Sequence, residues 1–166
     1  MKKLLAIVLL LTAHISVAQQ VPKIENFASG LKAHGTSYSA FSGKNKLWEI
    51  HAKKIESTQE KAKASGITGT LYSTGKPRYY MKSPVAFINV ATNDIFFPEG
   101  VILHGKQGEE VTVSTLTWRA KEKKFYGAKG VVMVHLNTKV QGDRMVLDQT
   151  MKDIRIKGHV KAEVKP

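Results

Sequence analysis

Histidine, aspartate and serine are the residues of this sequence that could support catalysis or hold a metal ion. The histidines are scattered, with no HxH or HxxxH spacing that would bring two rings to one metal. They are His14, His34, His51, His104, His135 and His159. Cysteine is absent, and there is neither a GxSxG nucleophile motif nor a glycine-rich phosphate loop. Asp143, Asp148 and Asp153 lie in or beside turn sequences, without an obvious acid–base partner. From these observations together we expect no enzymatic activity, no metal site and no cofactor.

A large excess of basic residues is the stronger chemical signal. The chain has 26 Lys and Arg against 13 Asp and Glu, a formal net charge of +13. Such an excess predicts an anionic partner, which can be a nucleic acid, an anionic membrane or an anionic lipid. The stretch TLTWRAKEKKFYGAKGVVMVH, Thr115–His135, places basic residues beside Trp118, Phe125 and Tyr126. This interleaving is typical of a nucleic-acid surface, and equally of two strands joined by a solvated turn.

The N-terminal sequence bears on that choice. MKKLLAIVLLLTAHISVAQQ has two lysines, an apolar run Leu4–Ala13 and the small-residue pattern Ser16-Val17-Ala18. This order predicts residues 1–18 to be a secretory signal cleaved after Ala18, or alternatively an uncleaved membrane anchor. Without Lys2 and Lys3 the chain keeps 24 basic residues against 13 acidic, a net charge of +11. Export of a protein makes nucleic acid an improbable natural ligand, so a lipid or membrane partner is favoured.

Short alternating apolar segments separated by turn sequences fill the rest of the chain. They predict an all-β protein, a sandwich, jelly roll or barrel, in one domain. The expected strands are Thr36–Phe41, Leu47–Ile55, Thr68–Tyr72, Arg78–Met81, Val85–Val90, Asp94–Phe97, Val101–His104, Glu110–Trp118, Lys124–Tyr126, Val131–Asn137, Asp143–Asp148, Ile154–Ile156 and Val160–Val164. The segment STQEKAKAS, residues 57–65, is interpreted as a polar loop or one turn.

Four glycines recur at nearly even spacing in similar β-rich contexts. Gly69, Gly100, Gly130 and Gly158 are 31, 30 and 28 residues apart. We interpret them as a weak repeat of one hairpin per roughly 30 residues. Coincidence is the alternative, because glycine is common in turns.

Several segments, in this order, make the sequence resemble the LptC family of lipopolysaccharide export proteins. They are LTW (Leu116–Trp118), GDRMVLD (Gly142–Asp148) and IKGHV (Ile156–Val160), within a resemblance that covers Leu47 to Val164. The family belongs to the OstA-like group with LptA. The resemblance implies a single antiparallel β-jelly roll, two sheets in an open V, over residues 47–166, after a signal or anchor (1–18) and a lead-in segment (19–46).

The resemblance also implies a function. Family members bind the acyl chains of lipopolysaccharide between the sheets and pair edge strands end to end. The expected partners are an inner-membrane lipopolysaccharide ABC transporter and an LptA-like bridge protein. The expected location is the periplasm, either in solution after signal cleavage or attached to the inner membrane. An exported β-sandwich module that binds polyanions or glycans through exposed lysines and aromatic side chains is the alternative.

Alternation along the strands gives the candidate groove residues, although the same pattern also describes an ordinary core. They are Trp48, Ile50, Leu103, Val113, Leu116, Trp118, Val132, Val134, Met145, Leu147, Ile154 and Ile156. Arginine and lysine at the mouth of such a groove would attract lipid phosphates. The candidates for that role are Arg78, Arg119, Lys124 and Arg144, with a solvated surface as the alternative.

Overall fold

The computed structural model describes residues 31–34, 36–58, 60–148 and 150–165, and it gives them an all-β fold. The strands are β1 (Leu31–His34), β2 (Ser37–Ser42), β3 (Asn45–Ser57), β4 (Lys61–Ser73), β5 (Lys76–Asn89), β6 (Ile95–Phe97), β7 (Val101–Gly105), β8 (Glu110–Arg119), β9 (Lys124–His135), β10 (Thr138–Gly142), β11 (Arg144–Leu147), β12 (Ile154–Lys157) and β13 (Lys161–Val164). Every recorded pairing is antiparallel. The predicted fold class is therefore confirmed. The segment predicted as a signal or anchor lies outside the described residues.

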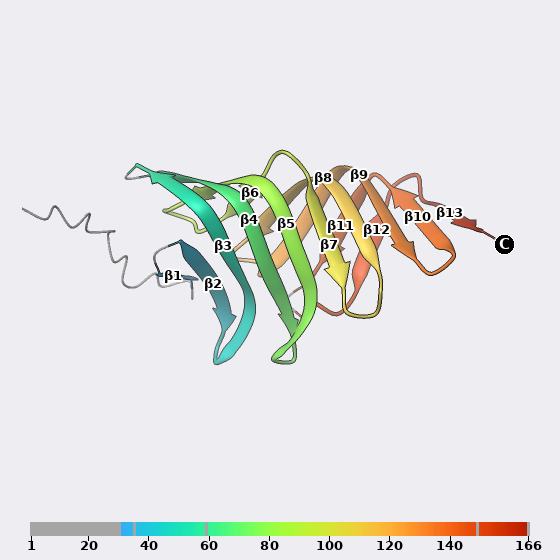
Figure 1. The fold of residues 1–166 in the computed structure, drawn as a ribbon, viewed down its shortest axis with the longest axis horizontal. Coiled ribbons are helices and arrows are strands. Elements are labelled where there is room, and N and C mark those ends of the chain that lie inside the picture. The colour runs from blue at the N-terminus through green and yellow to red at the C-terminus, as the bar shows by residue number, and fades with distance from the viewer. Residues whose placement is uncertain (1–30, 35, 59, 149, 166) are drawn as a thin grey trace, which may run out of the picture.

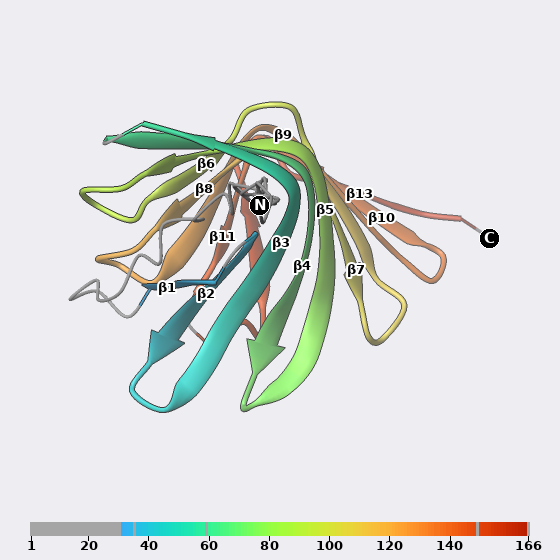
Figure 2. The same cartoon turned by 60° about the vertical axis from the view of Figure 1, so that its left-hand side comes forward.

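Two arms arise because the long strands change partners along their length. The first half of β5 pairs with β7 and its second half with β6, and β8 likewise pairs with both. Strand β9 pairs with β11 through its first half and with β10 through its second. We call the layer that contains β2, β7, β10 and β13 the β7 arm, and the layer that contains β6, β11 and β12 the β6 arm. Figure 1 shows the strands following one another along the long axis, and Figure 2 shows the long strands bending between the arms.

A crease runs across the molecule where these strands bend. In β4 the inward side chains shift by one residue at Gly66, between buried Ala64 and buried Ile67. Gly66, Gly100, Gly130 and Gly158 all have positive φ, between 64° and 99°. Backbone of this kind favours glycine because it has no Cβ. Three of the four glycines in the predicted repeat thus share one role, whereas Gly69 does not belong to the set and Gly66 takes its place.

Hydrogen bonds join neighbouring positions along this crease. Ser83 Oγ donates to the carbonyl of Gly100 at 2.8 Å, and Gly130 N–H donates to the carbonyl of Asp143 at 3.1 Å. Asp143 N–H in turn donates to the carbonyl of Gly158 at 3.0 Å. These bonds therefore tie β5 to the β6–β7 connection, and β9 to the β10–β11 and β12–β13 turns, along the crease.

Several strand predictions were wrong in their extent. Residues 57–65 are not a loop throughout, because β4 begins at Lys61. The two segments predicted on either side of Ser83 are one strand, β5, and the two predicted on either side of Ala128 are one strand, β9. Strand β10 was not predicted at all. The sheet also begins before Leu47, since β1, β2 and the start of β3 lie within the predicted lead-in.

Candidate functional site

The inner face of the β7 arm carries one continuous row of directly opposed residues across nine strands. The row is Tyr38, Ile50, Gly69, Met81, Leu103, Val111, Met133, Val140 and Ala162. Opposed residues lie on the same face of a sheet. At about 4.8 Å per strand the row is roughly 38 Å long. It therefore provides an apolar track from β2 to β13.

Burial along this row falls toward the C-terminal end. Leu103 and Val111 are fully buried, Met133 and Val140 are half-buried, and Ala162 is exposed. Position 69 has space only for glycine, since a Cβ there would lie 2.8 Å from Ile50 Cγ2 and 2.9 Å from the Glu49 carbonyl oxygen. The track is thus tightly covered near β3–β5 and open near β13.

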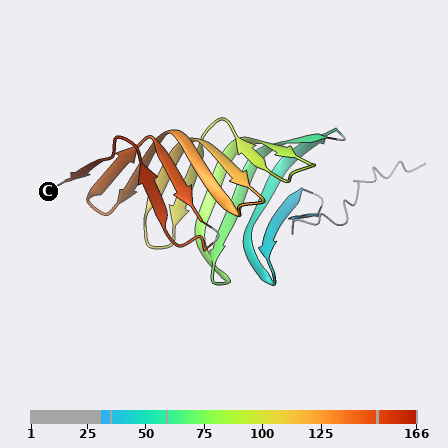
Figure 3. The same ribbon diagram turned by 180° about the vertical axis from the view of Figure 1, so that it is seen from behind.

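The β6 arm presents a matching inner face. Its opposed residues are Ala62, Ile88, Ile95, Trp118, Phe125, Leu147 and Ile154. All of them are buried except Ile154, the last in the row, which is half-buried. Both arms therefore become more accessible toward the same end of the molecule, where Figure 3 shows the short strands β10 to β13.

Three aromatic side chains join the arms at the other end. Trp48 of the β7 arm meets Trp118 of the β6 arm edge to face, with ring centroids 5.5 Å apart. Phe125 packs on Trp118 at 4.8 Å and lies 6.4 Å from Trp48. Each ring is at most 2% exposed. Such aromatic pairs add about 0.5–1.5 kcal/mol beyond the burial of their area, so this cluster holds the arms together.

The segment that joins β11 to β12 covers the space between the arms near this cluster. Met151 is fully buried, and its neighbour Lys152 accepts a 3.4 Å hydrogen bond from the Tyr79 hydroxyl through its carbonyl. Burial raises the pKa of Tyr79, so that hydroxyl keeps its proton. Lys123 Nζ donates to Ser42 Oγ at 3.0 Å, which links the β8–β9 and β2–β3 turns. A shallow pocket of about 310 Å³ lies beside these contacts, lined by Lys46, Tyr72 and Lys152 among others.

The C-terminal end lacks such closure among the described residues. Val160 is 53% exposed and Val164 is 74% exposed. Strand β12 pairs with β11 and β13 pairs with β10, so each ends its own arm as an edge strand. Apolar inner side chains and two strand edges therefore occur together at this end, which we call the open mouth. It is bordered by Met133, Val140, Ile156 and Ala162.

Most of the predicted groove residues lie on the inner faces. Trp48, Ile50, Leu103, Val113, Leu116, Trp118, Met145, Leu147, Ile154 and Ile156 all do so. Val132 and Val134 do not, because their register partners are Thr112 and Glu110 on the outer face, and Val134 is 40% exposed. The inward residues of this half of β9 are Val131 and Met133. In an unbroken apolar run such as VVMV, either alternate set of residues could point inward. Pairing with the inward Val113 and Val111 of β8 determines which set does so.

Arg78 is engaged by the protein itself. Its guanidinium forms an ion pair with Glu109, whose side chain is 6% exposed, and stacks 4.4 Å from the ring centre of Tyr79. Burial alone would raise the pKa of Glu109. The hydrogen bond and positive charge of Arg78, together with backbone N–H donors, lower it by more, so the pKa of Glu109 lies below its usual value. Arg78 therefore fastens the β7–β8 turn to β5.

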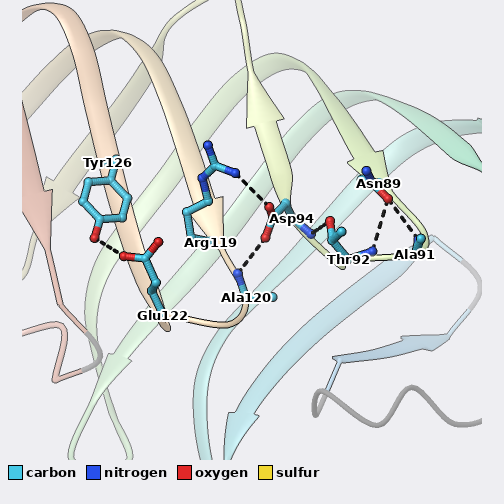
Figure 4. Close-up of polar contacts among 8 residues, drawn as sticks. All are labelled: Asn89, Ala91, Thr92, Asp94, Arg119, Ala120, Glu122 and Tyr126. Atoms are coloured by element: carbon cyan, nitrogen blue, oxygen red, sulfur yellow. Dashed lines mark hydrogen bonds and ion pairs between the residues drawn. The ribbon is translucent and has the colours of Figure 1, made fainter.

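The other three predicted phosphate-binding cations lie on the back of the β6 arm. Arg119, Lys124 and Arg144 each stand next to an inward residue, Trp118, Phe125 and Met145, and so point outward. Arg119 donates to Asp94 at 3.1 Å. Figure 4 shows this contact next to the one between Tyr126 and Glu122. None of the three is placed between the arms.

The histidines stay apart. His51 contacts Ser37, His104 contacts Glu110 and His159 contacts Asp143, each on a different part of the sheet. No group of three metal-ligating side chains occurs within the described ranges. The same part of the chain contains no helix with the length and apolar character needed to cross a membrane.

The sequence missed Met133 and Val140, which line the open mouth. The apolar run VVMV did predict a strand there, but the prediction placed Val132 and Val134 inward instead of Val131 and Met133. Val140 lies in the polar sequence TKVQG, where a single apolar residue gives no periodicity.

Comparison with known proteins places this architecture. The structure is similar to LptH from Pseudomonas aeruginosa, described as the LptA-homologous periplasmic component of the lipopolysaccharide transport device, with a TM-score of 0.52 and 8% sequence identity. The match covers 72% of this chain and 95% of LptH, and at that identity it shows the shared fold. No curated protein matches the sequence.

The family evidence covers nearly the whole chain. The family described as lipopolysaccharide-assembly, LptC-related, matches residues 4–165. Its proteins serve lipopolysaccharide transport and are not enzymes. The chain belongs to this LptC-related family and is a non-enzymatic component of lipopolysaccharide transport.

Proposed function

We propose that this protein carries lipopolysaccharide across the periplasm, with the acyl chains lying between the arms at the open mouth. The observation that carries the proposal is the inner row of the β7 arm, whose burial falls from Leu103 to Ala162. An acyl chain needs an apolar surface that water can leave, and half-buried Met133, Val140 and Ile156 offer one.

Transfer to the next protein would occur through the edges at the same mouth. A strand edge has unpaired N–H and C=O groups and can add a strand from a partner. If β13 or β12 receives such a strand, the partner's inner face continues the apolar track without a gap. The lipid could then pass from an inner-membrane ABC transporter, through this chain, to an LptA-like bridge protein. The lipopolysaccharide would leave through the open mouth, where the inner side chains are least buried.

A photocrosslinking residue tests the lipid site. At Val140 it would face the inside, and at the adjacent Gln141 it would face outward. We expect a crosslink to lipopolysaccharide from position 140 and little from position 141. Equal crosslinking from both positions would contradict the proposal. Salt-sensitive binding through the outer surface alone would instead favour a polyanion-binding module.

A proline tests the edge. Lys165 N–H donates to the Asn137 carbonyl, so alternation directs the N–H groups of Lys161 and Glu163 toward β10 and that of Ala162 away from it. Ala162→Pro therefore removes an outward donor while it preserves the pairing with β10. We expect loss of capture of an LptA-like partner with unchanged unfolding. Glu163→Pro, which breaks the inner pairing, is the control for damage to β13 itself. Retention of the partner by Ala162→Pro would exclude the β13 edge.

A further inference from the structure

The outer face of the β6 arm carries a row that the carrier function does not use. Seven directly opposed residues on seven strands form it, and we call it the outer row. They are Lys63, Phe87, Phe96, Thr117, Tyr126, Val146 and Arg155. Phe87 is 43% exposed and Phe96 is 42% exposed. At about 4.8 Å per strand the row is roughly 29 Å long, with an apolar centre, Lys63 at one end and Arg155 at the other. Beyond Lys63, strand β3 continues the row with Glu56.

Further cations flank the row on both sides. Arg119 and Lys124 are opposed on one side, and Arg144 and Lys157 are opposed on the other. Within the described part of the chain, Lys63, Lys124 and Arg144 form no ion pair. The outer row is therefore an apolar strip in a basic surround.

The carboxylates of this face are engaged by neighbours. Asp94 accepts from Arg119 and from Ala120 N–H, and Glu122 accepts from the Tyr126 hydroxyl (Figure 4). Asp148 accepts from Thr150 N–H at 2.9 Å and lies 3.9 Å from the Arg155 guanidinium. Glu56 pairs with Lys54 at 2.6 Å. Each of these carboxylates therefore has a donor or a cation beside it, whereas Lys63, Lys124, Arg144 and Lys157 have no ion pair in the segments that the structure describes.

We propose that the outer row rests on the surface of an anionic phospholipid bilayer. Phenylalanine inserts at the boundary between headgroups and acyl chains, and tyrosine, with its apolar ring and polar hydroxyl, is favoured there too. Lysine and arginine are attracted to anionic headgroups. Phe87 and Phe96 are directly opposed, and Tyr126 lies two strands farther along the same row, so all three side chains are on one face. A second copy of this chain is a poor occupant, because two chains with a net charge of +13 each repel.

The outer face of the β7 arm provides the contrast. Tyr80, at 43% exposed, and Val134, at 40%, are also accessible there. Their shared row contains Glu49 and Glu110 and ends in Glu163 on β13. These three carboxylates oppose an anionic surface, whereas the outer row meets only Glu56, beyond Lys63. Exposure of apolar side chains alone thus does not distinguish the two faces, whereas charge does.

Single-cysteine labelling of the full chain tests which face meets the bilayer, because the protein has no native cysteine. Thr117→Cys puts a fluorophore in the outer row, and Thr112→Cys puts it on the same strand at the outer face of the other arm. The probe is a phosphatidylglycerol vesicle that carries a lipid-attached quencher, compared with a phosphatidylcholine vesicle. We expect quenching at position 117 on the anionic vesicle, several times that at position 112, and a loss of the difference at high salt.

Both labelled proteins share the same N-terminal segment, so attachment through that segment affects them equally. Equal quenching at the two positions, stronger quenching at 112, or no dependence on anionic lipid would overturn the proposal. The outcome does not depend on lipopolysaccharide binding, which the crosslinks at positions 140 and 141 measure separately.

Paired substitutions identify the groups responsible. Phe87→Ser with Phe96→Ser should reduce the quenching at position 117 by about tenfold, whereas the equally exposed pair Tyr80→Ser with Ile102→Ser should leave it unchanged. Lys124→Gln should weaken it about fivefold. Unchanged thermal unfolding confirms that each variant is folded. If the Phe pair and the Tyr80 pair behave alike, the outer row is not the membrane contact.

Discussion

Ile50 and Ala162 occupy the same inner row of the β7 arm, yet Ile50 is 1% exposed and Ala162 is exposed. The cause is the position of their strands in the sheet and the length of the neighbouring strands. Strands β3, β4 and β5 have 13 or 14 residues and cross the crease, so each contributes to both arms. Strands β10, β12 and β13 have five or four residues, and each belongs to a single arm. Short strands with neighbours on both sides, such as β7 with Leu103, are still buried on their inner face, whereas the short strands at the C-terminal edges have no further strand beyond them and leave theirs open.

The same contrast separates two uses of apolar residues. At the β2–β5 end the aromatic cluster and Met151 fill the space between the arms, so these side chains stabilise the fold. At the open mouth the side chains are half-buried and no aromatic residue bridges the arms within the described residues. We therefore expect substitutions at the first end to change stability and those at the second to change ligand binding.

Truncation of an aromatic core residue gives the largest expected effect. Trp118→Ala should lower the free energy of unfolding by about 3–5 kcal/mol, because a large cavity opens between Trp48 and Phe125. Met133→Ala, at the open mouth, should cost about 1 kcal/mol, since Met133 is only half-buried and water already reaches it. Urea unfolding measures both. Equal losses would show that the mouth is as tightly packed as the closed end.

Removal of a buried ion-pair partner comes next. Arg78→Ala should cost about 3 kcal/mol, because it leaves the Glu109 carboxylate without its cation at 6% exposure. At the open end, Asp143→Asn should change stability by less than about 1 kcal/mol, since the His159–Asp143 pair is exposed to solvent. Thermal unfolding at pH 7 compares the two. A large loss from Asp143→Asn would contradict the distinction.

Acid should reveal the same pair. The pKa of Glu109 is lower in the folded protein than in the unfolded chain, where it is about 4.3. The folded state is thus favoured above that pH, and its advantage disappears as the pH falls through the folded pKa. Glu109→Gln should flatten the fall of stability below about pH 5. An unchanged pH profile in that variant would show that other carboxylates carry the acid sensitivity.

A glycine at each end tests the packing more gently. Gly69→Ala should cost about 1–3 kcal/mol, because the new Cβ meets Ile50 and the backbone carbonyl of Glu49, which cannot move away. At Gly142 the new Cβ would lie 2.4 Å from Cγ2 of Ile156, and the nearest carbonyl oxygens, of Gly158 and Lys157, would lie farther away at 3.2 and 3.3 Å. Because Ile156 is only half-buried, its side chain can turn about χ1 with less loss of packing than that of Ile50, so Gly142→Ala should cost less. Unfolding by urea decides between them. A greater loss of unfolding free energy for Gly142→Ala would mean that the side chains at the open mouth cannot rearrange around the new Cβ.

The sequence allowed the fold class and most of the strands to be predicted, because alternation is clear where one face is buried and the other charged, as in LWEIHA. It failed at the crease. Ser83 and Pro84 in β5 and Gly130 in β9 look like turn residues, but they bend a strand that continues. The start of β4 was missed since its inward residues, Ala62 and Ala64, are too small to stand out among lysines.

The candidate site was predicted less completely than the fold. Pattern alone cannot separate a core residue from a groove residue, because both point inward. What separates Trp118 from Ile156 is the number of strands that lie beyond each one, and that depends on the complete sheet order. The outward position of Arg119, Lys124 and Arg144 follows from their inward neighbours, but which outer surface they share is fixed only by register across β8, β9, β11 and β12.

The smallest expected change in stability accompanies the largest expected change in binding. Val140→Asp puts a carboxylate among the half-buried side chains of the open mouth, where water can still hydrate it, so the free energy of unfolding should fall by less than about 1 kcal/mol. An acyl chain in the same place would strip that water, and the unpaired charge should then weaken lipopolysaccharide binding by at least about tenfold. Displacement of a fluorescent lipopolysaccharide measures the binding, and Gln141→Asp, one residue away on the outer face, is the matched control. If Val140→Asp unfolds the protein, the mouth belongs to the core and the two ends of the inner row do not differ in function. If Val140→Asp is stable and binds normally, the acyl chains lie elsewhere.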